Sequence, residues 1–209
     1  MEDQAYQSSD DEDFGIVSMN LAYGHHDVKI IASRGELPEL TDDALTWGRV
    51  KDTYAIDYPV DVVASSNGNR SPELKRAISG LRVVISDEIP TNAKWIVLTL
   101  GKRSQALTLP ALSALPYGES SVELDCTGSR GVKNAQAAIY TLAGEEEWTS
   151  TAHIAVKDAT GKVITSFDLP DVTLKKNRMT VLTGEVFNRQ NGFTVSLDDA
   201  WDTDKTGVF

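Results

Sequence analysis

The sequence predicts an all-β protein with the architecture of an antiparallel β-sandwich. Apolar segments of roughly five to eight residues recur roughly every 10 to 15 residues, and turn-forming residues separate them. Amphipathic helical patterns are nearly absent. This combination indicates strands that fold back on one another rather than strands that alternate with helices.

The N-terminal part of the chain predicts an acidic arm and three strands. Residues 1–13 end in four consecutive acidic residues and predict a flexible, solvated arm. The first two expected strands are residues 14–23, which alternate loosely, and residues 28–32, which are rich in β-branched side chains. The third, residues 54–63, contains Pro59, which cannot donate to a ladder, so it predicts an edge strand or a bulge.

Two long loops interrupt this pattern. Residues 36–48 predict a loop with one helical turn at 41–45, because Thr41 can cap such a turn. Residues 65–72 are the strongest loop signal in the chain. A domain boundary is expected between residues 65 and 80.

The second part of the chain predicts a series of strands. They are expected at residues 81–85, 95–100, 106–109, 121–124, 135–142, 151–156 and 163–169. Residues 135–142 have some helix propensity, but their setting favours a strand. Asp158 to Gly161 predicts a hairpin turn, with glycine where a positive φ is needed.

Composition limits the classes of function. The formal charge of −11 disfavours a nucleic-acid partner, since phosphate binding needs a basic face, and it disfavours docking to an anionic membrane. Cys126 is the only cysteine, which excludes an intramolecular disulfide and zinc sites built on paired thiolates. The acidic N-terminus lacks the apolar core of a signal peptide, so we expect either a cytoplasmic protein or a targeting segment upstream.

The sequence gives only weak signals for metal-ligating or catalytic residues. His25 and His26 are expected in a turn, and adjacent strand residues would point to opposite faces; His153 stands alone. There are two acidic clusters: Asp198, Asp199, Asp202 and Asp204 around Trp201, and Glu145 to Glu147. The first could suggest a calcium site and the second a glycosidase site, but both are expected to be solvated surface. The sequence therefore predicts no catalytic, cofactor-binding or metal-binding residue, and a protein that is not an enzyme.

The tryptophans leave one alternative open. Trp47 and Trp148 border loops and could form an exposed platform for carbohydrate, although packing is favoured for both. Trp95 lies in an apolar strand and is expected in the core. A carbohydrate-binding surface β-sandwich is therefore the alternative function.

The last strand pair carries a resemblance. Residues 174–187 predict one long strand, followed by a returning strand at 193–197 with strict period two. The pattern resembles the C-terminal motif of the fimbrillin-like proteins of Bacteroidetes, the pilus subunits and anchors of the FimA, FimB and Mfa type. The matching positions are Leu174, Asn177, Arg178, Thr180, Gly184, Phe193 and Val195. Weaker matches lie at residues 21–28, 52–54 and 74–85.

The resemblance implies a fold and a role. The fold is a pair of transthyretin-like, Greek-key and immunoglobulin-like β-sandwiches, expected here at residues 14–75, a short domain, and at residues 76–209. The role is a cell-surface fimbrial subunit, anchor or accessory protein, exported as a lipoprotein to the outer membrane. Its implied partners are other fimbrial subunits and a surface receptor or glycan, with no cofactor. No arginine or lysine precedes Lys29, so no site for arginine-specific trimming is visible, which favours an anchor, tip or accessory protein over a shaft subunit.

Two pairings of the returning strand follow. It can pair within its own domain, as a hairpin partner of residues 180–187, or add to the sheet of another subunit. The hairpin is preferred for the isolated chain. In either case Phe193, Val195 and Leu197 face one side of the sheet.

Overall fold

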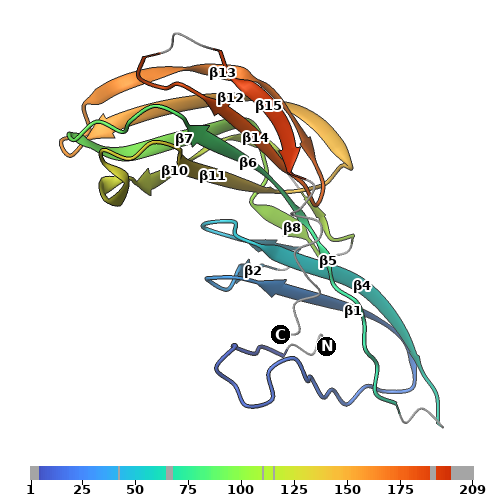
Figure 1. Ribbon diagram of the computed structural model, residues 1–209. Coiled ribbons are helices and arrows are strands. Elements are labelled where there is room, and N and C mark those ends of the chain that lie inside the picture. The colour runs from blue at the N-terminus through green and yellow to red at the C-terminus, as the bar shows by residue number, and fades with distance from the viewer. Residues whose placement is uncertain are drawn as a thin grey trace.

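The protein is described by a computed structural model that covers residues 5–41, 43–64, 68–109, 111–114, 116–188 and 192–198. These residues form 15 strands, one short 3-10 helix at Thr127–Ser129, and no α-helix. The strands make four sheets (Figure 1). No helix in this part of the chain has the length and apolar character needed to cross a membrane.

Eight strands form a β-sandwich. They are β6 (Ile78–Ile85), β7 (Ala93–Arg103), β10 (Gly118–Asp125), β11 (Ala135–Leu142), β12 (Glu147–Asp158), β13 (Val163–Lys175), β14 (Met179–Gly184) and β15 (Thr194–Asp198). One sheet, which we call the β7 sheet, has the order β10–β7–β12–β13. The other, the β6 sheet, has the order β11–β6–β14–β15. The all-β class and the sandwich predicted from the strand pattern are confirmed.

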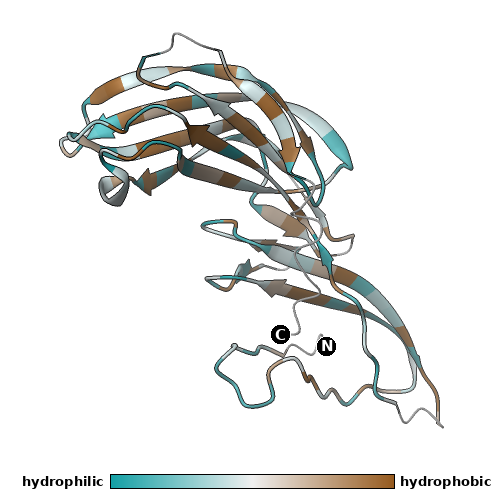
Figure 2. Ribbon diagram, viewed as in Figure 1, coloured by the Kyte–Doolittle hydropathy of each residue, from teal (hydrophilic) through white to brown (hydrophobic). Residues whose placement is uncertain are grey.

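The sandwich core follows from the period-two pattern of its strands. Leu81, Val83 and Ile85 on β6 project into the same core cluster as Leu98 and Leu100 on β7, and all five are fully buried. Burying each such side chain contributes about 1.5–3 kcal/mol. Figure 2 shows the apolar residues recurring along the strands of both sheets.

One ladder joins distant parts of the sequence. β14 pairs with β6 in parallel, with Met179 opposite Gly80 and Gly184 opposite Ile85. All other ladders among the described strands are antiparallel. A parallel pair cannot be joined by a tight turn, so β7 to β13 lie between β6 and β14 in the sequence.

The N-terminal part forms a ribbon beneath the sandwich in the view of Figure 1. The ribbon pairs β1 (Gly24–Ser33) with β4 (Thr53–Val62), and the two-residue β5 (Lys75–Arg76) pairs with the start of β4. Pro59 lies beyond the segment that β5 covers and is opposite Asp27 of β1. The ribbon is therefore two-stranded at Pro59, which agrees with the prediction of an edge position.

The ribbon has two unlike faces. One face carries His26 and an apolar set, and none of these residues is buried: Val28, Ile30, Ala32, Tyr54, Ile56, Tyr58 and Val60. The other face is polar near the ribbon tip, where His25 pairs with Asp61, and Lys29 with Asp57. The apolar face is thus a half-covered sheet surface rather than part of a closed core.

A small sheet connects the ribbon to the sandwich. It contains β2 (Glu39–Leu40), β3 (Ala44–Thr46), β8 (Ala106–Thr108) and β9 (Ser113–Ala114), in that order. A second core cluster spans this junction: Leu45, Trp47, Val50, Ile78, Leu107, Ala114, Leu142 and Met179. The small sheet therefore uses strands from both sides of residue 75, and the transthyretin-like pair of domains with a boundary there stays a prediction.

Residues 14–23 do not form the expected strand. They are a turn followed by a segment without regular structure, and Ile16, Val17 and Tyr23 are largely exposed. The Gln7 side chain holds the turn, donating to the Ile16 carbonyl at 2.7 Å and accepting from Gly15 N at 3.0 Å. Strand propensity alone is insufficient here, because no ladder within the described chain takes up this segment.

The expected helical turn at residues 41–45 is also wrong. Thr41 N donates to the Ala44 carbonyl at 2.9 Å, and Ala44 N donates to Thr41 Oγ1 at 3.2 Å. These bonds close a tight connection between β2 and β3. Thr41 does satisfy a backbone donor, as the sequence indicates, but in a strand connection rather than a helix cap.

The long strand expected at residues 174–187 is two strands. β13 ends at Lys175, and the chain turns through Asn177 at φ 56° before β14 begins. Asparagine tolerates this left-handed conformation, and Asn177 N donates to the Ile78 carbonyl at 2.8 Å.

The preferred hairpin is confirmed, since β15 pairs with β14. The strand at 135–142 and the Asp158 to Gly161 turn are confirmed as well.

Candidate functional site: an open seam between β13 and β15

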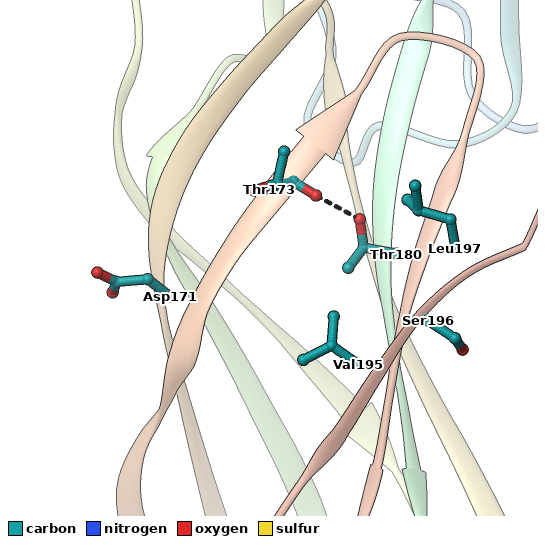
Figure 3. Close-up of a pocket in the computed structure, with 6 residues that line it drawn as sticks. All are labelled: Asp171, Thr173, Thr180, Val195, Ser196 and Leu197. Carbon is teal, nitrogen blue, oxygen red and sulfur yellow. Dashed lines mark hydrogen bonds between the residues drawn. The ribbon is translucent and has the colours of Figure 1, made fainter.

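The sandwich is open along one side, between β13 and β15. Each is the end strand of its sheet: β13 pairs only with β12, and β15 only with β14, among the described strands. A groove of about 360 Å³ lies between them (Figure 3). It is lined by Asp171, Thr173, Thr180, Val195, Ser196 and Leu197.

Apolar side chains line this seam without being covered. Val195 lies opposite Leu182, which is fully buried, so Val195 projects from the core side of the β6 sheet. Val195 nevertheless remains 52% exposed, and Leu197 remains 46% exposed. The described chain thus leaves part of an interior sheet face open to solvent.

Thr180 forms the floor of the groove. Its hydroxyl donates to the Thr173 carbonyl at 2.6 Å, as Figure 3 shows, and this bond ties β14 to β13. Thr180 is almost fully buried. A buried hydroxyl is costly unless it has a hydrogen-bond partner, so this bond satisfies Thr180 and joins the two sheets at the same time.

Replacing Thr180 by valine tests this link. The substitution keeps the shape of the side chain and removes the donor, so we expect the free energy of unfolding to fall by about 1 kcal/mol. Urea denaturation followed by circular dichroism measures it. Thr183→Val, a substitution in the same strand and of the same type, is the control and should change stability by less than about 0.5 kcal/mol. Equal effects of the two substitutions would contradict the role of Thr180.

A bulge in β13 flanks the groove. The ladder partners change from Leu169 with Ala152 to Val172 with Ser150, so Pro170 and Asp171 together oppose one residue of β12. A bulge of this kind bends its strand and increases the local twist. Pro170 also has no N–H to offer, which suits an end strand.

Phe193 closes one end of the seam. Its ring contacts Phe167 of β13, with 6.1 Å between the ring centroids. The ring also lies over Gly184, where an added Cβ would come within 2.7 Å of it. Glycine is required at this position because only a residue without a side chain leaves room for the Phe193 ring.

The C-terminal sequence motif maps onto this seam and its base. Leu174 is a core residue, Thr180 is the floor, and Gly184 accepts the ring of Phe193. Arg178 contributes its backbone, since its carbonyl accepts from Gly80 N at 3.2 Å. The motif therefore specifies how the chain turns and closes the sandwich, rather than a set of reactive groups.

Asn177 is hydrogen-bonded to Arg76, which in turn contacts Asp52 and Tyr54 in the N-terminal part. Arg76 Nη1 donates to Asn177 Oδ1 at 3.2 Å, and Arg76 Nε donates to Asp52 Oδ1 at 2.8 Å. Arg76 Nη2 donates to the Tyr54 hydroxyl at 2.6 Å, and the guanidinium lies 5.0 Å from the Tyr54 ring centroid. We call Asp52, Tyr54, Arg76 and Asn177 the junction cluster. It brings together the 52–54, 74–85 and C-terminal stretches that carry the sequence resemblance.

The histidines bind to nearby groups rather than to one another. His25 and His26 lie in β1, not in the expected turn, and they do point to opposite faces. His25 Nδ1 is 2.8 Å from Asp61 Oδ1, and this hydrogen bond, with the charge of Asp61, raises the pKa of His25. The His26 ring bonds to the Ala22 carbonyl. His153 is held between Asp168 and Ser166 on the sandwich surface.

The acidic clusters lie partly outside the described residues. Asp198 pairs with Arg82 at 3.2 Å, whereas Asp199, Trp201, Asp202 and Asp204 fall in the part that is not described. Glu146 and Glu147 pair with Lys176 and Lys175 in two surface ion pairs. Among the described residues no group of three or more His, Cys, Asp or Glu side chains is arranged to hold a metal ion.

The burial favoured for Trp47 and Trp148 is confirmed, whereas the core position expected for Trp95 is wrong. Trp47 and Trp148 are 2% and 6% exposed and belong to the two core clusters, so neither forms a surface platform. Trp95, expected in the core, is only partly buried and projects from the outer face of the β7 sheet. A residue next to a loop can still turn inward, and an apolar strand in a sandwich still has an outer face.

No protein-family model matches the chain, and no curated protein matches it. Two solved structures align with parts of the chain. A candidate adhesin from Bacteroides ovatus aligns with a TM-score of 0.49 at 10% identity, over 72% of this chain and 66% of its own length. A candidate cell adhesion protein from Bacteroides fragilis aligns with a TM-score of 0.36 at 13% identity, over 90% of this chain and 70% of its own length.

Proposed function

We propose that the protein is a cell-surface fimbrial subunit, anchor or accessory protein that acts in adhesion and pilus assembly through β-strand contacts. The observation that carries the proposal is the open seam, where Val195 and Leu197 project from an interior sheet face and remain about half exposed. The sequence motif that resembles fimbrillin-like proteins supports it, because that motif builds this seam. Under this proposal the protein is exported to the outer membrane and is not an enzyme.

The seam has the features that strand addition needs. An end strand presents unpaired N–H and C=O groups along its free edge, and an incoming strand satisfies them. Alternate side chains of that strand would cover Val195 and Leu197. The partner is therefore an extended segment of another subunit with apolar residues at every second position.

The N-terminal part offers a second set of such features. β1 pairs only with β4 among the described strands, and the ribbon it forms has a half-covered apolar face. The preceding segment, residues 16–23, is rich in apolar side chains yet lies outside any sheet. A chain that contains both an unused strand-like segment and free strand edges is suited to exchange strands between copies.

Val195→Lys tests the assembly role of the seam. Val195 is half exposed, so we expect the lysine variant to fold with a stability within about 0.5 kcal/mol of the parent. Its charge would, however, block an apolar strand from docking. Thr194→Lys, on the other face of the same strand, is the matched control.

The measurement uses the protein in its native cells. We expect the parent and Thr194→Lys to be cleaved by protease added to whole cells and to co-purify with sheared surface fibres. Val195→Lys should reach the surface but be lost from the fibres. Fractionation of the parent with the cytosol would overturn the surface role, and normal incorporation of Val195→Lys would overturn the role of the seam.

A further inference from the structure

The outer edge of β1 is a free edge of the N-terminal ribbon. Among the described strands β1 pairs only with β4, and β5 takes the other side of β4. Since β5 leads into β6, the sandwich follows on the β5 side of this sheet, and β1 forms the far edge (Figure 1). β1 has ten residues and no proline, so every residue in it keeps its N–H.

The backbone of β1 presents a defined set of groups at this edge. Arg34 directly follows β1, and its N–H donates to the Asp52 carbonyl at 2.9 Å, which continues the ladder with β4. In an antiparallel ladder, residues that direct their N–H and C=O to the partner strand alternate with residues that direct them away. The even-numbered residues of β1 therefore face β4, and the odd-numbered ones, from His25 to Ser33, offer their N–H and C=O at the free edge.

The apolar face of the ribbon ends at the same edge. Val28 and Ile30 are partly buried, and each has a cross-strand neighbour on β4 but none from another described strand on the outer side. Cross-strand pairs are the unit of sheet stabilisation, and a two-stranded ribbon is marginal in water. The edge is therefore suited to a further strand that carries apolar residues on this face.

The charges of β1 indicate which strand fits. Asp27 and Lys29 lie two residues apart on the polar face. A charge on an edge strand normally discourages pairing, because an apolar strand cannot neutralise it. Asp27 and Lys29 have opposite charges, however, so an antiparallel strand with the same two residues in reverse order neutralises both. The β1 strand of a second copy is such a strand.

We propose that two copies of the protein pair through the free edges of their β1 strands, antiparallel about a twofold axis at Val28. Val28 then lies opposite Val28 of the second copy, and Asp27 lies opposite Lys29 of the second copy on both sides of the axis. The two ribbons form one four-stranded sheet with its apolar side chains on one face. The inference goes beyond the proposed function, because the contact is the ribbon edge rather than the seam.

Backbone geometry and charge select this register over its neighbours. Directly opposed residues of an antiparallel pair are both hydrogen-bonded or both not, so odd-numbered residues must face odd-numbered ones. Moving the axis by one residue, to Lys29 or to Asp27, would place that residue opposite its own copy, and like charges directly opposite are destabilising. With the axis at Val28, the two valines form a pair of the closely spaced, non-hydrogen-bonded kind, with Cα atoms about 4.5 Å apart.

Lys29 and Asp27 can make these contacts without losing their place in the ribbon. Lys29 pairs with Asp57 of β4, and an ammonium group has three donors, so it can lie between Asp57 and Asp27 of the second copy. The Asp27 side chain is 67% exposed, and its Oδ1 lies 3.4 Å from His25 Nε2. Such an exposed contact contributes little to stability, so Asp27 can turn toward the second copy.

Residues 16–23 of the same chain are the competing occupant of this edge. They form no ladder with β1, and Ile16, Val17 and Tyr23 are largely exposed. The His26 ring bonds to the Ala22 carbonyl just before the strand begins. Residues 16–23 contain no charged side chain, so as a third strand they would leave the charges on the outer side of β1 without partners. A second copy supplies those partners.

The test is the oligomeric state of the full chain, measured by sedimentation velocity over a range of concentrations. We expect a reversible dimer. Asp27→Lys places two lysines opposite each other and Lys29→Glu two acids, so each variant should dimerise at least about tenfold more weakly than the parent. An equimolar mixture of the two variants restores opposite charges at both positions and should recover most of the affinity as a heterodimer. Circular dichroism checks that both variants are folded.

Disulfide crosslinking reports the register. Val28→Cys places two thiols at the axis, with a Cα separation within the range that a disulfide spans, so mild oxidation should give a covalent dimer. Val60→Cys, on the same face but on β4, is the matched control and should stay uncrosslinked. The native Cys126 is buried and does not compete.

The outcomes separate this inference from the proposed function. A chain that stays monomeric, a dimer that neither charge reversal weakens, or a mixture that recovers no affinity would overturn the β1 interface. None of these results bears on the seam, because Val195→Lys should dimerise like the parent. Equal crosslinking of Val28→Cys and Val60→Cys would overturn the register. Loss of the surface role would leave the dimer, which is measured with purified protein, unchanged.

Discussion

Replacing Asp87 by alanine is expected to lower the free energy of unfolding by about 3–4 kcal/mol. The Asp87 side chain, 6% exposed at the end of β6, accepts three successive backbone N–H groups, from Val186 at 2.9 Å, Phe187 at 2.7 Å and Asn188 at 2.9 Å. Alanine would leave these donors without their carboxylate acceptor, and Val186 is fully buried. Urea denaturation followed by circular dichroism measures the loss.

Two companion substitutions separate the hydrogen bonds from other effects. Asp87→Asn keeps one acceptor oxygen and the side-chain shape, so its loss should be about half as large. Glu88→Ala removes the neighbouring exposed carboxylate and should change stability by less than about 0.5 kcal/mol. A loss below about 1 kcal/mol in Asp87→Ala would show that water or another group replaces the carboxylate.

Replacing Arg76 by methionine is expected to cost about 3 kcal/mol, the second largest effect. The Arg76 side chain is 5% exposed and its partner Asp52 is 19% exposed, so the ion pair is largely removed from solvent. Methionine preserves most of the side-chain volume but leaves the Asp52 carboxylate and Asn177 Oδ1 without the guanidinium. Arg76→Lys should recover only part of the stability, since an ammonium group cannot reproduce the planar, multidentate geometry.

A double-mutant cycle tests whether the junction cluster acts as a unit. Asp52→Ala and Arg76→Met are each measured alone and together by urea denaturation. We expect a coupling energy above about 1 kcal/mol, because the two side chains share one pair of hydrogen bonds. Additive effects would mean that Arg76 is held mainly by its other contacts.

Limited proteolysis of Arg76→Met should also show faster cleavage at residues 68–74, which precede β5.

Local sequence patterns predicted the strands well where period two was strong. Residues 135–142 became β11 despite their alanine content, because their alternate residues Ala137 and Ile139 face the core. The pairing of β15 with β14 followed from the short connection between them. The parallel ladder between β14 and β6 could not be predicted, because nothing local links strands about a hundred residues apart.

Burial was predicted less well than strand position. Trp148 follows a charged loop, and the packing favoured for it is confirmed: it lies in the core, with its ring 5.6 Å from that of Tyr117. Trp95 lies in an apolar strand, yet it faces outward beside Lys157. The error at Trp95 has a physical cause: the inward direction of a strand residue depends on the register of its ladder, which the neighbouring residues in the sequence do not specify.

The sequence singled out the strand pair that borders the candidate site, but it did not predict the groove. The motif from Leu174 to Val195 covers the region in which the seam lies, because its Asn177 and Gly184 carry backbone requirements that few residues meet. The groove itself depends on β13 and β15 being end strands, and that property is set by the order of strands in the two sheets. Sequence patterns identify a strand without showing whether its second edge is free.

The parallel pairing of β6 and β14 gives the sandwich a directional response to mechanical tension. The N-terminal part enters at the Ile78 end of β6, and Gly184 leaves β14 at the opposite end of the same ladder. Tension between these two points pulls the strands past each other and loads all their hydrogen bonds together. β15 runs the other way, with Asp198 opposite Met179, so tension at Asp198 breaks its bonds one after another. A molecule stretched through its chain would therefore yield in two steps, a soft unzipping of β15 and then a stiff shear of β14 against β6.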